Sequence, residues 1–486
     1  MQFKRKSYFL IAASCLLTAC MVGPDFRPPL APPVSQYTQS PVPKKTVRAE
    51  GQRQYFIAGC DVPAAWWRLF HSVEINQLID AGLAHSPNLE AALANWKQAQ
   101  ELLNAQIGST LYPSVTGQLG AQRQRYSVQN IGGTGANIGG SPTVEFNLYN
   151  AGVNISYTLD VFGGLRRQVE AFAAQVDYNR YLYDAAYLTL TSNIVTTALG
   201  IASMDAQIDA MHDIIIALKE QLKIVEKQYK LGGTSGANVL QQVNQLAATE
   251  AILPQLEQTR AQLQHSLAVL IGEFPGNTQA IHINLDTLKL PQILPTSLPC
   301  AVVRHRPDVM AAEATLHAAS AKIGVAVANL YPQFNLTGAY GWTNSTPGNL
   351  FAYPNNVWNF GGNLLQPIYN AGALQAQKRA AIDAYQAAAE QYRQTVLQAF
   401  QNVADTLRAI ENDSRALKDQ RTAEIAAKGS LVITEKQYKV GGVSYISLLT
   451  VQNQYQQARI NRIKAQAARL SDTAALFQAL GGDWWR

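Results

Sequence analysis

Residues 226–233 read Glu-Lys-Gln-Tyr-Lys-Leu-Gly-Gly, and residues 435–442 repeat them with one change, Leu to Val. Two shorter motifs recur at nearly the same separation: His-Ser-Pro at 85–87 with His-Arg-Pro at 305–307, and Leu-Tyr-Pro at 111–113 and 330–332. The three separations are 209, 220 and 219 residues. A near-constant offset across three motifs indicates a tandem duplication.

Each repeat contains one stretch that predicts an unusually long helix. Between Gly164 and Leu231 there is no proline and one internal glycine, and about 67 residues at 1.5 Å each give about 100 Å of helix. The second repeat offers a matching helix between Gly372 and Val440. Apolar residues follow each other in steps of three and four, the heptad pattern of coiled coils, at Ile201, Met204, Ile208, Met211, Ile215, Leu218, Leu222, Val225 and Tyr229, and at Val396, Phe400, Val403, Leu407, Ile410, Ser414 and Leu417.

Both long helices end at a Gly-Gly turn, after which a helical pattern resumes over about 236–272 and 444–480. We therefore predict two antiparallel helical hairpins, at 164–272 and 372–480. Pro254 lies inside the first return helix and predicts a kink there.

Ahead of each hairpin, at about 113–159 and 332–369, the apolar period changes from seven to two, which predicts two strands per repeat. Alternation of this kind fits a transmembrane barrel strand and a half-buried soluble strand equally well. Four strands cannot close a barrel, and lipid cannot satisfy open sheet edges, so oligomerisation would have to supply the rest. The interval 132–140 is glycine-rich but has no lysine and no GxGxxG spacing, which predicts a mobile loop and no nucleotide site.

The N-terminus, 1–19, reads as a signal peptide. Lys4-Arg5-Lys6 precede the short apolar stretch Tyr8–Leu17, and Leu-Thr-Ala-Cys ends at Cys20. This pattern resembles a bacterial lipoprotein signal, so we expect Cys20 to be the lipidated mature N-terminus; an ordinary signal cleaved elsewhere is the alternative. The apolar stretch is too short to span a bilayer. Position 21 is Met and not Asp, which by resemblance to lipoprotein sorting favours the outer membrane.

The remaining boundaries follow from the repeats. They are a lipidated, proline-rich tether at 20–62, a first repeat at 63–277, a linker at 278–294 and a second repeat at 295–486.

Composition excludes several classes of function. The net charge of +6 falls to +3 once the signal is removed, and the basic residues do not cluster, so no nucleic-acid binding is expected. The seven histidines form no HExxH motif, and there is no GxSxG or Walker sequence, so we predict no enzyme, no catalytic residues and no cofactor apart from lipid at Cys20.

Paired histidines, cysteines and tryptophans have simple structural interpretations. His85 and His305 occupy equivalent repeat positions beside proline, which we interpret as helix-start chemistry and not as a metal site. Cys60 and Cys300 are 240 residues apart without a CxxC motif, so no zinc site is expected, while a disulfide and two buried thiols both remain open. The Trp-Trp pairs at 66–67 and 484–485 predict packing.

Several motifs together resemble the NodT/OprM-type lipoproteins of the TolC outer-membrane efflux family. They are Arg306-Pro307-Asp308-Val309 with Ala312-Glu313, Leu330-Tyr331-Pro332, the two Tyr-Lys-Leu/Val-Gly-Gly turns, and the terminal Ala479-Leu480-Gly481-Gly482. The resemblance covers residues 20–486. It implies a mostly α fold with a β-barrel portion: duplicated long helical hairpins form a periplasmic α-barrel, and four strands per chain contribute to a 12-stranded transmembrane β-barrel of a homotrimer.

The same resemblance implies a passive exit duct of the cell outer membrane, lipid-anchored and extending into the periplasm. Its partners would be a periplasmic adaptor and an inner-membrane transporter, with outer-membrane lipid around the barrel. A periplasmic adaptor lipoprotein with coiled-coil hairpins is the runner-up, and an inert structural lipoprotein is a third possibility. The cargo and the type of transporter stay open.

Two groups of site residues are expected at the ends of the hairpins. The tip that docks the adaptor would comprise the two turns, with Gly232, Gly233, Ser235, Gly441, Gly442 and Ser444. The lumen constriction would comprise Tyr445, Ser447 and Thr450. Relatives often carry acidic residues a few positions after the second turn, whereas this chain has hydroxyls. We therefore expect a closed tip without a ring of carboxylates, and Tyr445 either adds bulk there or packs between helices.

Overall fold

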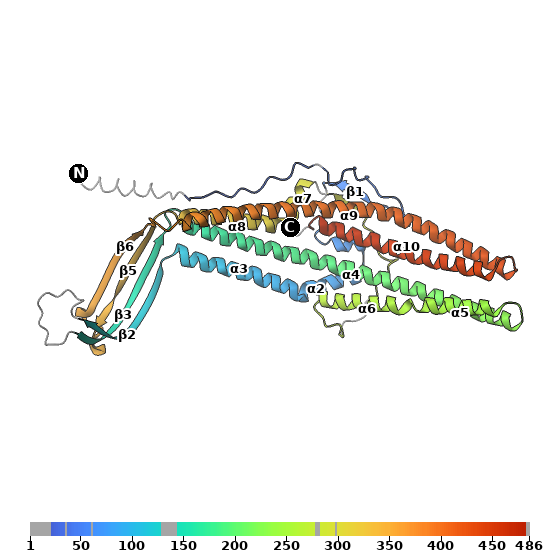
Figure 1. Cartoon of the computed structure of the whole chain (residues 1–486), viewed down its shortest axis with the longest axis horizontal. Coiled ribbons are helices and arrows are strands. Elements are labelled where there is room, and N and C mark those ends of the chain that lie inside the picture. Colours follow the sequence, from blue (N-terminus) through green and yellow to red (C-terminus); the bar gives the residue numbers. More distant parts are fainter. Residues whose placement is uncertain are drawn as a thin grey trace. The chain divides into compact units, whose positions relative to one another are not determined.

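The computed structural model describes residues 21–34, 36–59, 62–127, 143–277, 282–296 and 299–482 (Figure 1). The predictions for the signal peptide, Cys20, Cys60, the 132–140 interval and the Trp484-Trp485 pair fall outside the described residues.

The two long helices are confirmed. Helix α4 spans Gly164–Lys230 and α9 spans Ala373–Lys439, each of 67 residues. Neither contains an internal proline, and the heptad positions are covered: Val403, Ile410 and Leu417 of α9 are at most 3% exposed. Burial of these apolar seams stabilises helices that propensity alone would leave marginal.

Each long helix is followed by a return segment. In the second repeat it is the single helix α10, Tyr445–Ala479. In the first it is two helices, α5 (Gly236–Glu250) and α6 (Leu253–Leu270). The kink expected at Pro254 is thus confirmed as a break, and the proline stands in the first turn of α6, where its missing N–H leaves no bond unmade.

A pair of shorter helices precedes the strands in each repeat. Helices α2 (Val73–His85) and α3 (Pro87–Leu111) match α7 (Pro299–His305) and α8 (Pro307–Ala328). The interpretation of the two histidines as helix-start residues is wrong, because each is the last residue of the preceding helix. The helix stops there since the next residue precedes a proline, and such a residue disfavours the helical conformation.

The duplication extends to a glycine contact at these histidines. Gly272 and Gly481 follow the return helices with φ of 78° and 93°. Each lies against the backbone carbonyl of the histidine in its own repeat, His85 or His305, where a side chain would overlap that carbonyl. Both the positive φ and the close approach require glycine.

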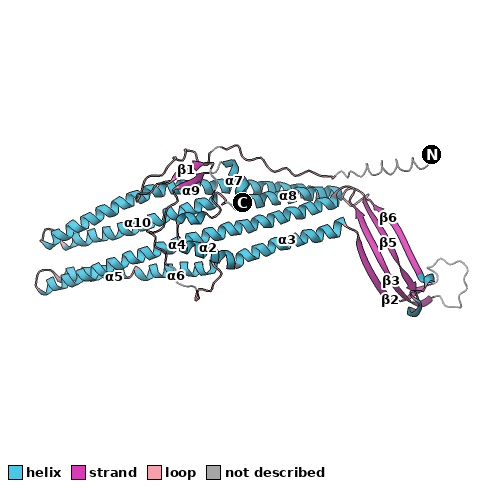
Figure 2. Cartoon of the chain, turned by 180° about the vertical axis from the view of Figure 1, so that it is seen from behind, coloured by secondary structure: helices cyan, strands magenta, loops and turns pink. Residues whose placement is uncertain are grey.

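The predicted strands form one antiparallel sheet (Figure 2). Its order is β2 (Ser114–Ser127), β3 (Thr143–Leu159), β5 (Gln333–Asn344) and β6 (Asn356–Leu365), with short 3-10 turns at Pro347–Asn349 and Tyr353–Asn355 between the last two. The pairing of β3 with β5 joins the two repeats, and β2 and β6 are the edges.

A second, two-stranded sheet was not predicted. Strand β1 (Tyr55–Ala58) pairs in parallel with β4 (Ile293–Thr296). The segments predicted as a tether and a linker are therefore not free chains, because both contribute to the packed core. Gln54 and Leu294 are fully buried, and Leu285 is 2% exposed. Four-residue strands, one of them containing Pro295, carry too little periodicity to be recognised in a sequence.

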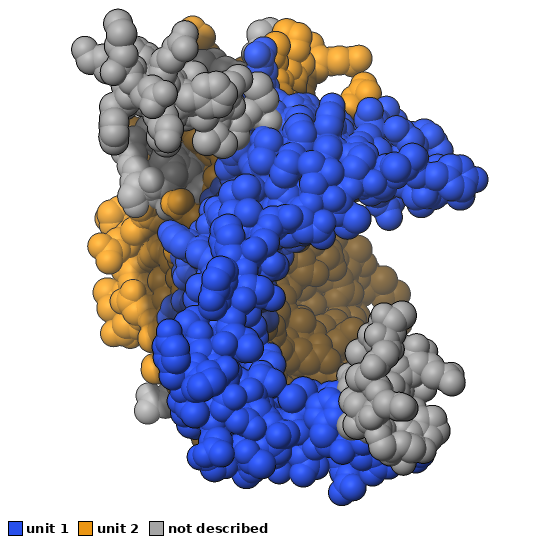
Figure 3. Space-filling view, turned by 90° about the vertical axis from the view of Figure 1, so that its left-hand side faces the viewer, with its two compact units in different colours: residues 1–28, 97–177, 314–390 blue, residues 29–96, 178–313, 391–486 orange. Residues whose placement is uncertain are grey.

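The chain divides into two compact units, and each draws on both repeats (Figure 3). Unit 1 comprises residues 1–28, 97–177 and 314–390, and it contains the four-stranded sheet; unit 2 comprises residues 29–96, 178–313 and 391–486, and it contains both Gly-Gly turns. The repeat is thus a unit of sequence, whereas the compact units form by pairing equivalent parts of the two repeats.

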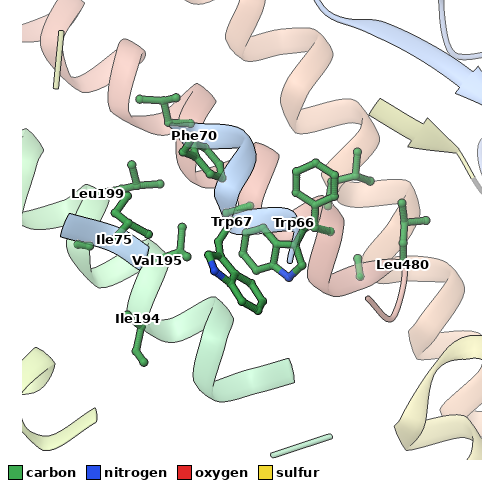
Figure 4. Close-up of a cluster of buried hydrophobic side chains, with 14 of the residues drawn as sticks. Trp66, Trp67, Phe70, Ile75, Ile194, Val195, Leu199 and Leu480 are labelled. Atoms are coloured by element: carbon green, nitrogen blue, oxygen red, sulfur yellow. The ribbon is translucent and has the colours of Figure 1, made fainter. Parts of the chain in front are cut away.

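The main core belongs to unit 2 and surrounds a 3-10 helix, Trp66–Phe70 (Figure 4). Trp66 is 1% exposed, and its ring stacks on Phe477 with centroids 5.4 Å apart. The predicted packing role of Trp66 and Trp67 is confirmed. Among the described helices, α4 alone is apolar and long enough to cross a membrane, yet 56% of its most apolar window is buried, as in a core helix.

Candidate functional site

The four-stranded sheet has one apolar and one polar face, and the register keeps each face continuous across all strands. The row Val115, Ile155, Gly338 and Phe360 shows the apolar face, as does Gly117, Val153, Tyr340 and Trp358. These large side chains are not covered: Leu119 is 81% exposed, Trp358 74% and Phe360 78%. An uncovered apolar surface of this extent marks an interaction with lipid or protein.

The opposite face is polar. It carries Gln118, Asn150, Asn154, Thr158, Asn335, Thr337, Asn359 and Asn363, with glycines between them and apolar exceptions at Phe146, Leu148, Val357 and Leu365 near the strand ends. Cross-strand hydrogen bonds link several of the amides: Asn154 Nδ2 donates to Gln118 Oε1 at 2.9 Å, and Thr158 Oγ1 to Asn335 Oδ1 at 2.7 Å. A face of this kind suits contact with water.

The length of the apolar face matches a membrane. On β3 it extends from Leu159 to Tyr149, a run of about 33 Å along the strand. With the strand tilt of about 40° found in barrels, its height is about 25 Å, the height of the apolar band of outer-membrane barrels. Aromatic residues lie near both ends, Tyr149 and Trp342 at one and Phe334 and Tyr157 at the other, while Tyr340 and Trp358 lie in the row of Val153 nearer the middle.

The N-terminal segment of unit 1 is held by a buried arginine. Arg167, in the first turn of α4, is 1% exposed. Its guanidinium donates to Asp25 Oδ1 at 2.6 Å, to Glu170 Oε2 at 2.8 Å and to the carbonyl of Val22 at 3.3 Å. Loss of Asp25 or Glu170 would leave the charge of this buried guanidinium with a single carboxylate partner, which destabilises the attachment.

Glycine and aromatic contacts complete this attachment. Gly23, with φ of 93°, lies against Gly324 of α8 so closely that a side chain would overlap backbone. Phe26 stacks on His317 with centroids 4.4 Å apart, and His317 Nε2 lies 2.9 Å from Glu170 Oε1. The residues that follow Cys20 are therefore fixed on α4 and α8. Sequence reasoning missed this, because Arg167 has no special spacing and residues 21–28 read as a tether.

The two turns of the predicted tip have equivalent geometry. Gly232 and Gly441 have φ of 75° and 77°, and the next glycine of each turn donates to the carbonyl five residues before it, at 2.7 and 2.8 Å. Ser235 and Ser444 cap α5 and α10 by accepting a backbone N–H. These bonds account for the tight reversal. Leu231 and Val440 beside them are 87% and 83% exposed.

The three residues predicted for the constriction do not lie together on the surface. Tyr445 is 4% exposed and packs with Val225 and Leu448 between helices, with its hydroxyl donating to Gln242. Within the described chain it therefore takes the packing role. Ser447 and Thr450 are exposed, and the Thr450 hydroxyl donates to the carbonyl of Ile446 at 2.9 Å.

A half-buried acid pair in unit 2 was not predicted. Asp413 of α9 lies beside Asp472 of α10, and burial, together with a hydrogen bond and repulsion from Asp472, raises the pKa of Asp413 to about 7. Arg469, 2% exposed, lies next to the pair, and burial lowers its pKa to about 10. Arg469 also donates to Gln54 Oε1 at 3.1 Å, so this arginine links α10 to the N-terminal segment.

The acid pair makes stability depend on pH. The pKa of Asp413 is higher in the folded than in the unfolded state. The contribution of Asp413 to the free energy of unfolding is therefore greatest below about pH 4, and it is lost as the pH rises to about 7. Asp413→Asn should remove this loss and raise the apparent melting temperature at pH 8 by about 5 °C relative to wild type. Thermal unfolding at pH 5 and pH 8 measures it, with the exposed Asp419→Asn as control; an unchanged pH dependence in Asp413→Asn would refute the assignment.

Known proteins resemble this chain along almost its whole length. It is 28% identical over 484 residues to the pyoverdine export outer membrane protein OpmQ of Pseudomonas aeruginosa, covering 99% of this chain and 97% of that protein. It is 27% identical to the cation efflux system protein CusC of Escherichia coli, covering 96% and 97%. The solved structure of the Campylobacter jejuni CmeC outer membrane channel has the same fold, with a TM-score of 0.83, 19% identity and 95% coverage of both chains.

The sequence profile of one family matches both repeats. It is the family described as outer membrane efflux protein, and it matches residues 78–273 and 298–482. The predicted efflux function, outer-membrane location and fold class are confirmed by this match and by the structural likeness. The chain belongs to the outer membrane efflux protein family.

Proposed function

We propose that three copies of this chain form a passive exit duct, which receives cargo from an inner-membrane transporter through a periplasmic adaptor. The observation that carries closure by oligomerisation is the two-faced sheet with free edges at β2 and β6; the number three follows from the resemblance to the TolC family. In lipid, the unpaired backbone groups of an edge strand cost several kcal/mol each, so only closure is acceptable. Three sheets of four strands give a 12-stranded barrel with the polar face inside and the apolar face in lipid.

The polar face supports passive conduction without selection by charge. The lumen side of the described strands carries mainly amides, hydroxyls and glycines, with a few apolar side chains near the strand ends, and no charged side chain. Relatives named for pyoverdine and for cations show that the family passes unlike cargoes. A duct of this kind needs no catalytic step, because the transporter would supply the energy.

The proposed trimer has a direct test that also separates it from a periplasmic adaptor. Unheated membrane extracts should show a trimer band on denaturing gels that collapses to monomer on boiling, and the same trimer should conduct in planar bilayers. A chain that migrates as monomer at all temperatures and never conducts would favour the adaptor alternative.

Two further parts of the proposal concern the chain ends and the hairpins. We propose lipidation at Cys20, supported by the fixed attachment of the residues that follow it. We also propose that the two Gly-Gly turns dock the adaptor, supported by the exposed Leu231 and Val440 beside them.

The proposed tip should conduct weakly and almost independently of pH. Ser447 and Thr450 do not titrate, whereas a carboxylate ring would bind cations and respond to pH. Bilayer conductance should change less than about twofold between pH 5 and 8, and millimolar divalent cations should have little effect from the tip side. Strong divalent block that disappears in Ser447→Ala and Thr450→Ala would contradict this.

A further inference from the structure

The strand region contains a single cluster of charge. Residues 113–159 and 332–369 include all four strands and both hairpin loops, and in this sequence their only charged residues are Arg123, Arg125 and Glu145. The three lie together. Arg123 Nη2 is 3.2 Å from Glu145 Oε2, and Arg125 Nη1 is 3.6 Å from Glu145 Oε1. The cluster carries a net positive charge.

The cluster is on the apolar face of the sheet. Arg123 and Arg125 continue the alternate positions of Val115 and Leu119 along β2, and Glu145 lies on the matching positions of β3. The guanidinium groups are open to the surroundings, with side-chain exposure of 75% and 66%. Charges that serve an aqueous lumen would lie on the opposite face, so these face the lipid side of the proposed barrel.

Its height corresponds to the lipid headgroups. Ala121 pairs with Tyr149 at the end of the apolar band, Arg123 pairs with Asn147, and Arg125 pairs with Glu145. The two arginines are thus two and four residues beyond the band, about 5 and 10 Å higher at the usual strand tilt. The headgroup layer of a bilayer occupies about that depth outside the hydrocarbon.

The hairpin end of the strands would face the cell exterior. Each strand joins a long or medium helix at its other end, and under the proposed function those helices occupy the periplasm. The lipid beside the cluster is therefore that of the outer leaflet. Each guanidinium has five N–H donors, and Glu145 with Thr143 engages only part of them, so donors remain for a further anion.

We propose that Arg123 and Arg125 form a binding site for the phosphate of an outer-leaflet lipid headgroup, with Glu145 holding the two guanidinium groups side by side and weakening the site by its own charge. Two arginines bind phosphate through paired, charge-assisted hydrogen bonds, and these are stronger than an ion pair exposed to water. The proposal rests on the orientation given by the proposed function. It assigns one site to each protomer of the trimer.

Binding of bis-phosphorylated lipid A to the purified trimer in detergent tests the site by native mass spectrometry. Wild type should bind it, and Arg123→Gln with Arg125→Gln should weaken binding at least about tenfold. Glu145→Gln should strengthen binding several-fold, because the competing carboxylate is removed. Arg379→Gln, an exposed arginine of α9 outside the strands, is the matched control and should leave binding unchanged.

Other probes distinguish the source of the phosphate. Lipid A without phosphates should bind as weakly as the double variant does to the full lipid, and millimolar inorganic phosphate should compete poorly. Equal binding by wild type and double variant, or full displacement by inorganic phosphate, would overturn the lipid site. Conductance of the same preparations separates this from the duct: a conducting trimer without lipid binding rejects the site alone, whereas a protein that neither trimerises nor conducts rejects the proposed function.

Discussion

Cys20→Ser is expected to abolish incorporation of labelled fatty acid into the protein. The sequence before Cys20 reads as a lipoprotein signal, and a serine hydroxyl cannot replace the thiol that receives the lipid. The expected loss is complete, measured as acyl-label counts in the immunoprecipitated protein. Because the barrel itself would still hold the protein in the membrane, trimers should persist.

Cys300→Ser is the matched control for this result, since it removes a cysteine outside the signal. Its labelling should equal that of wild type. Acyl label that survives in Cys20→Ser would refute lipidation at this residue. The attachment of residues 21–26 to α4 and α8 would then have no role in placing a lipid.

Gly442→Trp is expected to prevent cross-linking to the adaptor while trimers still form. The position tolerates a side chain, because its nearest neighbour is the Gln437 carbonyl at 3.4 Å and its φ is not in the left-handed region. Gly441, with φ of 77°, would be strained by the same change. An indole at the exposed turn blocks close backbone approach, and we expect cross-link yield to fall at least about tenfold.

Gly276→Trp provides the comparison, since Gly276 is also exposed, lies in a turn and has open space around it. Cross-linking and trimer yield should both stay at the wild-type level. If Gly442→Trp likewise leaves both unchanged, the adaptor docks elsewhere and the turn serves only to reverse the chain.

Local periodicity explains which elements were predictable. The heptads of α4 and α9 and the alternation in β3 and β5 show directly which face of each element is apolar. Helix, strand and hairpin therefore follow from the residues themselves. The break before Pro254 follows from the missing N–H of proline. These features need no knowledge of distant contacts.

Features that depend on distant partners were not predictable. Strand β1 finds its partner β4 more than 230 residues away, and Arg167 pairs with Asp25, which precedes it by 142 residues. Asp413 and Asp472 acquire their shared environment from two helices that pack together. The Tyr445 alternatives could not be separated in advance, since one residue of helix rotation decides between lumen and core.

Chemical labelling of the two sheet faces tests the central claim most directly. Asn154 and Ile155 are neighbours on β3 that point to the polar and the apolar face. In a background of Cys60→Ser and Cys300→Ser, the variants Asn154→Cys and Ile155→Cys are reconstituted in lipid vesicles and treated with a charged, water-soluble maleimide. The account predicts rapid modification of Asn154→Cys with a fall in conductance, and protection of Ile155→Cys. Equal modification of both, or modification of Ile155→Cys alone, would contradict a barrel with the polar face around its lumen.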